Sequence, residues 1–426
     1  MSSASLGLPC GHKRCLHLTT GRSINVPKEQ RRVLVSKVYV AGVAMVPFTK
    51  PGRSETYNLM GAEAVRAALA DAGIAYSKVE QAYAGFVYGD STSGQKALYS
   101  VGLTGIPIIN VNNACATGST ALFLARQAVE SGAVDVALAV GFEQMMPGAL
   151  DVMFTDRPSI LENYVRIAEQ APGDDNTRPP AARLFGGAGA EYQRRTGFES
   201  RSFALVAEKA RRHAINNPLA IFRDPLTADE IMASPTIFGP LTRLQCCPPT
   251  CGAAAAIIVS EKFKRANPGR YVEIAAQAMT TDPAQSFSDG SLIDAVGFNM
   301  ARDAALQVYD KAGIGPQDVP VVELHDCFTT NEVLTYEALG LAAPGEAEKF
   351  IRDGDNTYGG RTVTNPSGGL LSKGHPLGAT GLAQCSELVW QLRGDADKRQ
   401  VAGAKVGLQH NLGLGGACVV TLYKAA

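Results

Sequence analysis

Residues Val111–Ala125 read VNNACATGSTALFLA, and this stretch decides the fold that we expect. The apolar run before it predicts a strand, and the alanines and leucines after Ser119 predict a buried helix. Cys115 stands at the turn between the two. The positive end of a helix dipole lowers the pKa of a nearby thiol and so favours a nucleophilic thiolate. Cys115 is therefore either a nucleophile or, as most free cysteines are, a small buried residue.

The composition is typical of a compact α/β protein. The chain has 426 residues, enough for two or three domains, with 46% hydrophobic residues and 44 glycines. Its net charge is zero and no apolar run reaches the roughly 18 residues that span a bilayer, so we expect neither a nucleic-acid nor a membrane partner. The nine scattered cysteines favour free thiols in a reducing compartment. Cys246, Cys247 and Cys251 lie close together, but without further ligands at zinc-finger spacing we expect no metal site.

The first 32 residues differ from the rest of the chain. They are basic, rich in serine and threonine, and contain one acidic residue, Glu29. This composition resembles a mitochondrial transit peptide, so we expect a mitochondrial protein. A disordered basic tail is the alternative, with a peroxisome-type organelle or the cytoplasm as the location. The chain ends Tyr423-Lys424-Ala425-Ala426, which is not the peroxisomal Ser-Lys-Leu signal.

Strands alternate with helices along the chain, which predicts a mostly parallel sheet covered on both faces. Between residues 147 and 234, prolines, glycines and charges become more frequent, and we interpret this segment as a large insertion. The expected strands are 33–46, 82–88, 106–111, 134–140, 253–259, 271–278 and 319–324, and the expected helices are 62–74, a helix from the Cys115 turn to about 131, 202–216 and 304–314.

The second half of the chain repeats features of the first. Segment 64–74 resembles segment 304–314, an offset of 240. A second match has an offset of 260, and at that offset Cys115 falls on His375. Such a long repeat predicts two similar α/β domains, each presenting a strand, a turn and a helix. The residues of the second match are Gly118, Thr120 and Leu122 in the first copy and Gly378, Thr380 and Leu382 in the second.

Reactive side chains gather in three segments of the second half, each after a strand-like run. Ligands of α/β sheets bind beyond the carboxyl ends of strands, so these segments are expected to converge on one site. They contain the three histidines His325, His375 and His410, for each of which a structural role is the alternative. The segments are Val321–Phe328, Ser372–Gly378 and Gln409–Gly416.

Four motifs carry a resemblance to a known family. The chain resembles the thiolase superfamily, most of all thiolases of the sterol-carrier-protein type, from about Arg32 to Lys424. Because it ends soon afterwards, we expect no appended sterol-carrier domain. The motifs are NNACATGS at 112–119, HDCF at 325–328, GHPLGA at 374–379 and NLGLGG at 411–416, with further agreement at 245–248, 355–360 and 365–369.

The resemblance implies the α/β thiolase fold. This fold has two duplicated βαβαβαββ halves in five layers, α/β/α/β/α, with an inserted loop domain that helps to bind coenzyme A. The repeat and the insertion agree with it. The expected segments are a presequence or tail at 1–32, the N-terminal half at 33–146, the loop domain at 147–234, a return to the N-terminal half at 235–265 and the C-terminal half at 266–426.

The resemblance also implies an activity. A 3-oxoacyl-CoA thiolase is an acyltransferase that cleaves 3-oxoacyl-CoA with coenzyme A through an acyl-cysteine, in β-oxidation of fatty acids or of branched and sterol side chains. The reverse Claisen condensation is also possible for the family. Coenzyme A is then a substrate, no cofactor or metal is expected, and the protein is expected to be a homodimer. The preferred acyl chain does not follow from the sequence.

The chemistry assigns roles to five residues of this sequence by resemblance. Cys115 is the nucleophile, with His375 as its base. The backbone N–H groups of Cys115 and Gly413 form one oxyanion hole, and His375 with His325 forms a second hole for the enolate. Cys327 is the acid/base that protonates the enolate carbon and later deprotonates coenzyme A.

Some positions depart from the usual thiolase pattern. Most thiolases place the acid/base cysteine in a Cys-x-Gly motif where this chain has Asn411, and they have Asn-Glu-Ala-Phe where it has residues 325–328. The sterol-carrier type makes both changes, so we interpret the role as moved to Cys327. Cys251 replaces a frequent aspartate, and Ala114 replaces a more usual asparagine beside the nucleophile.

Two other functions remain open from the sequence. A condensing enzyme would use Cys-His-His or Glu-Cys-His sets on the same fold, and Cys327 with the Gly-His-Pro motif argues against it. A thiolase-like lipid-binding or transfer protein with little activity is the other alternative. Loss of Cys115, His325 or His375 would favour it, but all three are present.

Overall fold

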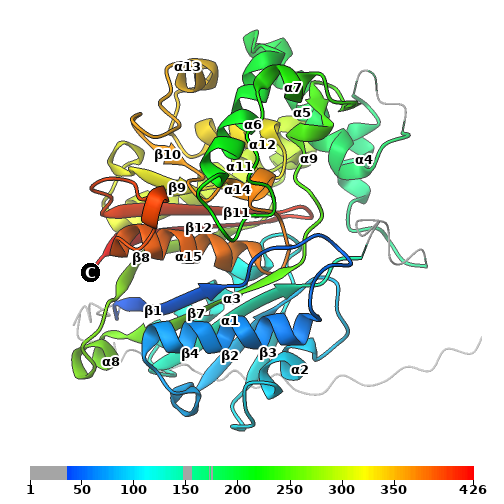
Figure 1. Ribbon diagram of the computed structural model, residues 1–426. Coiled ribbons are helices and arrows are strands. Elements are labelled where there is room, and N and C mark those ends of the chain that lie inside the picture. The colour runs from blue at the N-terminus through cyan, green and yellow to red at the C-terminus, as the bar shows by residue number, and fades with distance from the viewer. Residues whose placement is uncertain (1–35, 147–155, 172, 174–175) are drawn as a thin grey trace, which may run out of the picture. The chain divides into compact units, whose positions relative to one another are not determined.

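The computed structural model describes residues 36–426 apart from 147–155, 172, 174 and 175. The transit peptide expected at 1–32 lies outside the described residues, as does the start of the loop domain. In the described part of the chain, ten strands form one sheet in the order β10-β9-β11-β12-β8-β1-β7-β4-β2-β3 (Figure 1). These strands are β1 (Val38–Met45), β2 (Gln81–Gly85), β3 (Ile108–Val111), β4 (Val136–Glu143), β7 (Gly252–Ser260), β8 (Val272–Thr280), β9 (Val321–Glu323), β10 (Val363–Thr364), β11 (Val406–Gly413) and β12 (Ala417–Ala425).

The sheet consists of two halves with the same strand order. Reading outward from the centre, β1-β7-β4-β2-β3 matches β8-β12-β11-β9-β10. The halves join where β1 meets β8, through the residue pairs Tyr39–Glu273 and Val40–Val272. The repeat read from the sequence is therefore a structural duplication. The exact limits of the two halves and of the loop domain stay a prediction.

The expectation of a mostly parallel sheet is wrong. Five of the nine strand pairs are antiparallel, and four are parallel. A parallel pair needs a crossover connection, whereas β11 returns directly into β12 through a tight turn. Gly415 and Gly416 in that turn have φ of 104° and 95°, which the left-handed region allows mainly to glycine.

The two halves of the sheet form two layers of the fold, and the helices form the other three. Helices α3 and α15 share a hydrophobic core with strands of both halves and form the middle layer. Helices α1 and α2 cover the outer face of the N-terminal half, and α11 and α12 cover that of the C-terminal half (Figure 1). The helices are α1 (Tyr57–Ala72), α2 (Ser93–Tyr99), α3 (Thr117–Glu130), α4 (Glu162–Ala168), α5 (Pro180–Thr196), α6 (Ser200–Ala214), α7 (Ala228–Met232), α8 (Glu261–Ala266), α9 (Gln285–Ser288), α10 (Leu292–Ala295), α11 (Phe298–Ala312), α12 (Thr329–Ala338), α13 (Ala347–Arg352), α14 (Gly369–Ser372) and α15 (Thr380–Arg393).

The repeated helices α1 and α11 end in the same way. Gly73 and Gly313 follow them with φ of 65° and 64°, and each N–H bonds back to carbonyls of the last turn. A left-handed glycine cap ends a helix because no Cβ opposes that conformation. The stop expected at Gly73 is confirmed.

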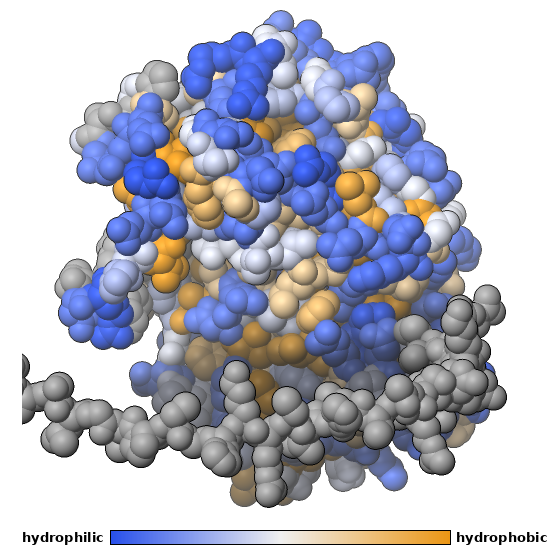
Figure 2. All heavy atoms as spheres, turned by 180° about the vertical axis from the view of Figure 1, so that it is seen from behind, coloured by the Kyte–Doolittle hydropathy of each residue, from blue (hydrophilic) through white to orange (hydrophobic). Residues whose placement is uncertain are grey.

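The inserted segment packs on the C-terminal half. Helices α5 and α6 share a core with α12, and the hairpin β5 (Thr236–Phe238) and β6 (Leu241–Thr242) follows them. None of the helices in the described residues is long and apolar enough to cross a bilayer. Figure 2 shows one face of the molecule, on which hydrophobic residues form small patches between hydrophilic areas.

Candidate active site

Cys115 lies in a tight turn between β3 and α3. Ala114 before it has φ of 47°, a left-handed conformation that costs a non-glycine residue about 1–2 kcal/mol. Side chains of the turn compensate: the Ala114 N–H donates to Asn112 Oδ1 (3.1 Å), and Thr117 Oγ1 accepts from the Asn113 N–H (2.8 Å). The strained turn holds Cys115 just ahead of the helix.

His375 lies in the equivalent turn, ahead of α15. Its Nδ1 lies 2.7 Å from Thr380 Oγ1, and the Thr380 hydroxyl donates to the Pro376 carbonyl (3.0 Å). A hydroxyl has one proton to donate, so Thr380 Oγ1 accepts from His375 Nδ1–H. The Nε2 atom of His375 then carries a lone pair, is buried, and has no hydrogen-bond partner among the described residues. This nitrogen is free to take a proton.

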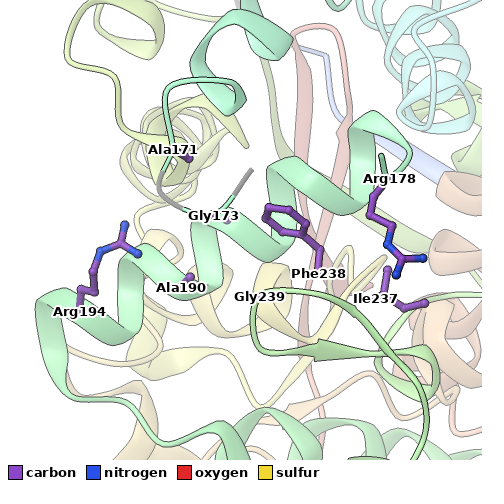
Figure 3. Close-up of a pocket in the computed structure, with 9 residues that line it drawn as sticks. Ala171, Gly173, Arg178, Ala190, Arg194, Ile237, Phe238 and Gly239 are labelled. Atoms are coloured by element: carbon purple, nitrogen blue, oxygen red, sulfur yellow. The ribbon is translucent and has the colours of Figure 1, made fainter. Parts of the chain in front are cut away.

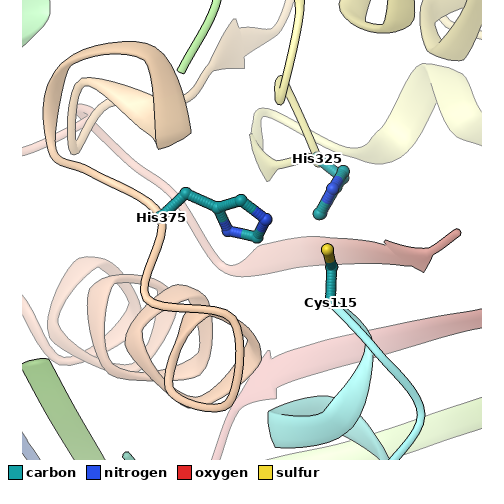
Figure 4. Close-up of side chains that lie close together, drawn as sticks. All are labelled: Cys115, His325 and His375. Atoms are coloured by element: carbon teal, nitrogen blue, oxygen red, sulfur yellow. The ribbon is translucent and has the colours of Figure 1, made fainter. Parts of the chain in front are cut away.

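His325 joins the two turns. One atom each of Cys115, His325 and His375 (the thiol sulfur and a ring nitrogen of each histidine) lie within 4.8 Å of one another. The two imidazole rings stand edge to face with centroids 5.0 Å apart, and Figure 4 shows the His375 ring pointing toward the other two side chains. The structure therefore brings together three residues that the sequence places as much as 260 positions apart.

Cys327 and Gly413 border the same site. Cys327 is buried, its carbonyl accepts from the Cys247 N–H (2.9 Å), and its thiol lies near enough to those of Cys115 and Cys247 for their charges to affect its pKa. A Cβ on Gly413 would lie 2.3 Å from the Asn113 carbonyl oxygen, so only glycine fits against the Cys115 turn. The proposed roles of these residues stay predictions.

The N–H groups that face the Cys115 thiol belong to Leu414 and to Cys115 itself. The sequence had suggested no role for Leu414, the neighbour of Gly413. His410 lies behind the cluster, where its Nδ1 accepts from the His325 N–H (3.4 Å). All three reactive segments of the second half thus meet at Cys115, as expected.

Comparison with known proteins shows the family to which the chain belongs. The family model for the thiolase N-terminal domain matches residues 38–172, and the one for the thiolase C-terminal domain-like region matches residues 285–422. Human sterol carrier protein 2 is 54% identical over 393 residues, covering 91% of this chain and 72% of the human protein. The chain belongs to the thiolase superfamily. The resemblance to the sterol-carrier-protein type is confirmed.

More distant thiolase relatives extend the likeness. An acetyl-CoA acetyltransferase of Methanothermobacter thermautotrophicus is 35% identical, covering 91% of this chain and 99% of that protein. A solved structure named Ltp2-ChsH2(DUF35) aldolase superposes with a TM-score of 0.79 at 24% identity, covering 92% of this chain and 99% of that chain. Human mitochondrial 3-ketoacyl-CoA thiolase gives 0.70 at 18%, covering 92% and 100%. The two structures show the fold alone.

The protonation state of the Cys115 thiol differs from the one expected from the sequence. Burial, reinforced by the nearby Glu143 carboxylate, raises the pKa of the Cys115 thiol to about 12, and the two N–H groups offset this only in part. The expected lowering of the pKa by the helix dipole is therefore wrong. Burial also lowers the pKa of His375 to about 3. Thiol and imidazole both rest neutral, so an attack by this sulfur would require its proton to leave in the same step.

Two buried acidic residues, Glu323 and Asp326, connect the His325 and His375 loops. Glu323 forms a buried ion pair with Lys373 (3.2 Å), two residues before each histidine. Asp326 accepts the N–H groups of Leu370 (2.7 Å) and Leu371 (3.3 Å). Sequence reasoning missed these anchors, although an acidic residue at the end of an apolar run, as at Glu323, is a usable signal.

Glu143 makes a similar anchor from the N-terminal half. Its carboxylate accepts the N–H groups of Val87 (3.1 Å), Tyr88 (2.9 Å) and Gly378 (2.9 Å). Burial raises the pKa of Glu143 to about 7, although these three donors oppose the rise. The carboxylate therefore ties the His375 turn to the end of β4.

The cluster of Cys115, His325 and His375 contains the residue types of a zinc site but not its hydrogen bonding. A metal-bound histidine donates its other ring N–H to an acceptor. His375 Nδ1 lies 2.7 Å from such an acceptor, Thr380 Oγ1, whereas His325 Nδ1 lies 3.0 Å from the amide nitrogen of Asn411, which is a donor. The contact with Asn411 therefore does not orient His325 as a metal ligand in the way that an acceptor would. The donor set fits acid–base chemistry instead.

A cavity of about 260 Å³ lies on helix α5, beside the β5–β6 hairpin. The exposed side chains of Arg178 and Arg194 stand at opposite ends of it (Figure 3). On the same helix, the Phe185 ring stacks on Phe328, next to Cys327, with centroids 4.9 Å apart. The cavity therefore lies on the same helix that packs against Phe328, the neighbour of Cys327.

Proposed function

We propose that the protein is a 3-oxoacyl-CoA thiolase that cleaves its substrate with coenzyme A through an acyl-Cys115 intermediate. The observation that carries this proposal is the pairing of a partly exposed thiol, that of Cys115, with a buried histidine whose Nε2 has no other hydrogen-bond partner among the described residues. Attack on the ketone carbon moves the thiol proton to His375. The new N–H of His375, with His325, then stabilises the negative oxygen of the departing acetyl-CoA enolate.

The second half of the reaction needs another acid/base. We assign it to Cys327, whose buried thiol lies near Cys115. Burial raises the pKa of Cys327 well above its usual range, so the residue holds a proton to give to the enolate carbon. It then takes the proton of the incoming coenzyme A thiol, which attacks the acyl-cysteine and releases the shortened acyl-CoA.

We assign the anionic part of coenzyme A to the cavity on α5. Two guanidinium groups at its ends suit phosphate groups, because arginine binds them with paired hydrogen bonds. In this arrangement Arg178→Ala with Arg194→Ala raises KM for coenzyme A about 10-fold with little change in kcat. Arg157→Ala, at another exposed arginine, serves as the control.

The deciding experiment measures thiolysis of acetoacetyl-CoA and of longer 3-oxoacyl-CoA esters. Cys115→Ala is expected to lower kcat at least about 10³-fold, since it removes the nucleophile. Mass spectrometry of the wild type is expected to find the acyl group on the peptide that contains Cys115. Cys385→Ala, a buried thiol in α15, is the matched control and keeps its activity. Turnover that survives in Cys115→Ala refutes the proposal, and lipid transfer without thiolysis in the wild type supports the transfer-protein alternative.

Location and assembly are separate parts of the proposal. The basic composition of residues 1–32 supports import into mitochondria, and family resemblance supports a homodimer. Fusion of residues 1–32 to a fluorescent protein tests the first, with mitochondrial fluorescence expected. Sedimentation of the purified chain tests the second, with twice the mass of the 44.8 kDa chain expected.

A further inference from the structure

We infer that Asn411 is a positioning residue that holds His325 in the tautomer with its proton on Nε2, and so makes it a hydrogen-bond donor rather than a base or a metal ligand. The inference rests on the proposed function, because it explains how one site gives its two histidines different tasks. It starts from the two hydrogen bonds of the Asn411 amide nitrogen.

The orientation of the Asn411 side chain is fixed from both sides. Its Nδ2 lies 3.0 Å from the Cys115 carbonyl oxygen, which can only accept. Its Oδ1 accepts from the Ser119 hydroxyl (2.8 Å). The same Nδ2 lies 3.0 Å from His325 Nδ1. An amide nitrogen has two protons, so it donates one to Cys115 and the other to His325.

A chain of buried donors supports this orientation. Tyr423 OH donates to Gln409 Oε1 (2.5 Å), and Gln409 Nε2 donates to Ser119 Oγ (2.8 Å). Gln409 cannot turn over, because its Nε2 also donates to the Gly381 carbonyl (2.6 Å). Ser119 therefore has its proton left for Asn411. In this series of hydrogen bonds each residue donates to the next, from Tyr423 through Gln409, Ser119 and Asn411, and the last acceptor is Nδ1 of His325.

The two histidines consequently have opposite tautomers. His375 donates from Nδ1 to Thr380 and keeps a lone pair on Nε2, whereas His325 accepts at Nδ1 and keeps its proton on Nε2. A thioester enolate needs donors around its oxygen, and a lone pair there would repel it. His325 in the other tautomer would present that lone pair, and would also complete a Cys-His-His metal site.

The wild-type protein gives the most direct test. Chain labelled with ¹⁵N at histidine is examined by NMR, in which the correlations of the ring carbon-bound protons with both nitrogens distinguish the tautomers. His325→Gln assigns the His325 signals by their loss. We expect a proton on Nε2 in His325 and on Nδ1 in His375. A proton on Nδ1 of His325 overturns the inference, and His375 serves as the internal comparison.

Two variants test the consequence for chemistry. Asn411→Ala and Asn411→Asp both lose the hydrogen bond to the Cys115 carbonyl, but only the aspartate also accepts from His325 Nδ1–H. We expect kcat to fall about 10-fold with alanine and about 10²- to 10³-fold with aspartate, with KM changed less than kcat. Equal losses of kcat in the two variants contradict the inference.

Zinc binding provides a readout that needs no turnover. Titration with ZnSO₄ alone is expected to show about 10- to 100-fold tighter binding by Asn411→Asp than by the wild type, because the carboxylate orients His325 as a ligand. Cys115→Ala in the Asn411→Asp background is expected to abolish the gain, and the exposed control Asn216→Asp is expected to show none. Absence of the gain in a folded Asn411→Asp protein counts against the inference.

These outcomes separate the inference from the proposed function. If Cys115→Ala retains activity, the thiolase proposal fails while the tautomer of His325 can still be as inferred. If His325 has the other tautomer while Cys115→Ala is inactive, only the inference fails. Should Asn411→Asp not fold, the wild-type spectrum decides alone.

Discussion

The two halves of the sheet present equivalent turns with different chemistry. The turn before α3 carries Cys115 and is partly exposed, whereas the turn before α15 carries His375 and is buried. The first turn depends on a strained alanine, Ala114 with φ of 47°, and the second on a glycine, Gly374 with φ of 117°. The duplication thus provides two similar positions, and the proposed nucleophile and its proposed base occupy one each.

Each turn is held by the other half of the molecule. Asn411, near the end of β11 in the C-terminal half, donates to the Cys115 carbonyl. Glu143, at the end of the equivalent strand β4, accepts from Gly378 in the His375 turn. Each half therefore supplies a hydrogen bond that holds the reactive turn of the other half, so neither half alone contains a complete site.

We expect the largest loss of stability from breaking the ion pair between Glu323 and Lys373, which both belong to the C-terminal half. Lys373→Met leaves the Glu323 carboxylate buried without its counter-charge, and should lower the free energy of unfolding by about 3–5 kcal/mol. Urea unfolding followed by circular dichroism measures it. The double variant Glu323→Gln with Lys373→Met should lose less than the single one, and an equal loss would show that the charge is not the cause.

The next effect concerns the anchor from the N-terminal half. Burial raises the pKa of Glu143 from its ordinary 4.5 to about 7, so between these values the folded protein binds more protons than the unfolded chain. Stability from this group is full below pH 4.5 and is lost as the pH rises to 7. The wild type should therefore lose about 3 kcal/mol relative to Glu143→Gln across this window. Urea titrations of both proteins at pH 4.5 and 7 measure this difference, and a constant difference would exclude proton uptake at Glu143.

A smaller effect is expected at the contact between the halves. Gly141→Ala would set a Cβ 2.1 Å from the Gly378 carbonyl oxygen, a backbone atom that cannot move without the His375 turn, and should cost about 2 kcal/mol of stability. For Gly407→Ala in the equivalent strand β11, the three nearest atoms to the added Cβ all belong to side chains, and the closest is Leu388 Cδ2 at 3.1 Å. Thermal unfolding compares the two, and similar losses would argue against a tight contact at Gly378.

The smallest effect is expected from the partner of His375. Thr380→Val keeps the shape of the side chain but removes the acceptor for Nδ1–H, so the base loses its fixed orientation. The variant should lower kcat about 10-fold and stability by about 1 kcal/mol, because the buried Nδ1–H keeps no acceptor. Steady-state kinetics measure it, with the exposed Thr56→Val as control. A loss of stability well above about 1 kcal/mol together with reduced kcat would indicate a general packing defect instead.

The sequence predicted the parts of the fold that repeat or alternate. The helices at α1, α3, α6 and α11 follow from apolar periodicity, and the offset of 260 correctly paired the Cys115 and His375 turns. Strand direction did not follow, because β7 returns after the insertion and β12 after a tight turn, and neither connection leaves a periodic signal. Local patterns record which face is buried but not the direction from which a strand returns.

The site was predictable in its reactive residues and not in their supports. Cys115, His325 and His375 are reactive side chains at turns, which a sequence reveals. Asn411 and Glu143 act through contacts with residues 296 and 235 positions away. A single polar residue at the end of a strand does not indicate where in the sequence its partner lies. The predicted pKa of Cys115 was wrong for the same reason: burial by distant segments raises the pKa by more than the start of the local helix lowers it.

The position of β1 has a consequence for synthesis of the chain. All eight of its residues are buried between β7 and β8, and Val38 pairs with Ser260, which is translated 260 − 38, or 222, residues later. A ribosome that adds about 5–20 residues per second leaves this strand without either neighbour for roughly 10–45 s. An apolar strand with two open edges recruits other strands during that time. The strand that joins the two halves in the finished molecule thus has no sheet partner until the chain has been made as far as β7.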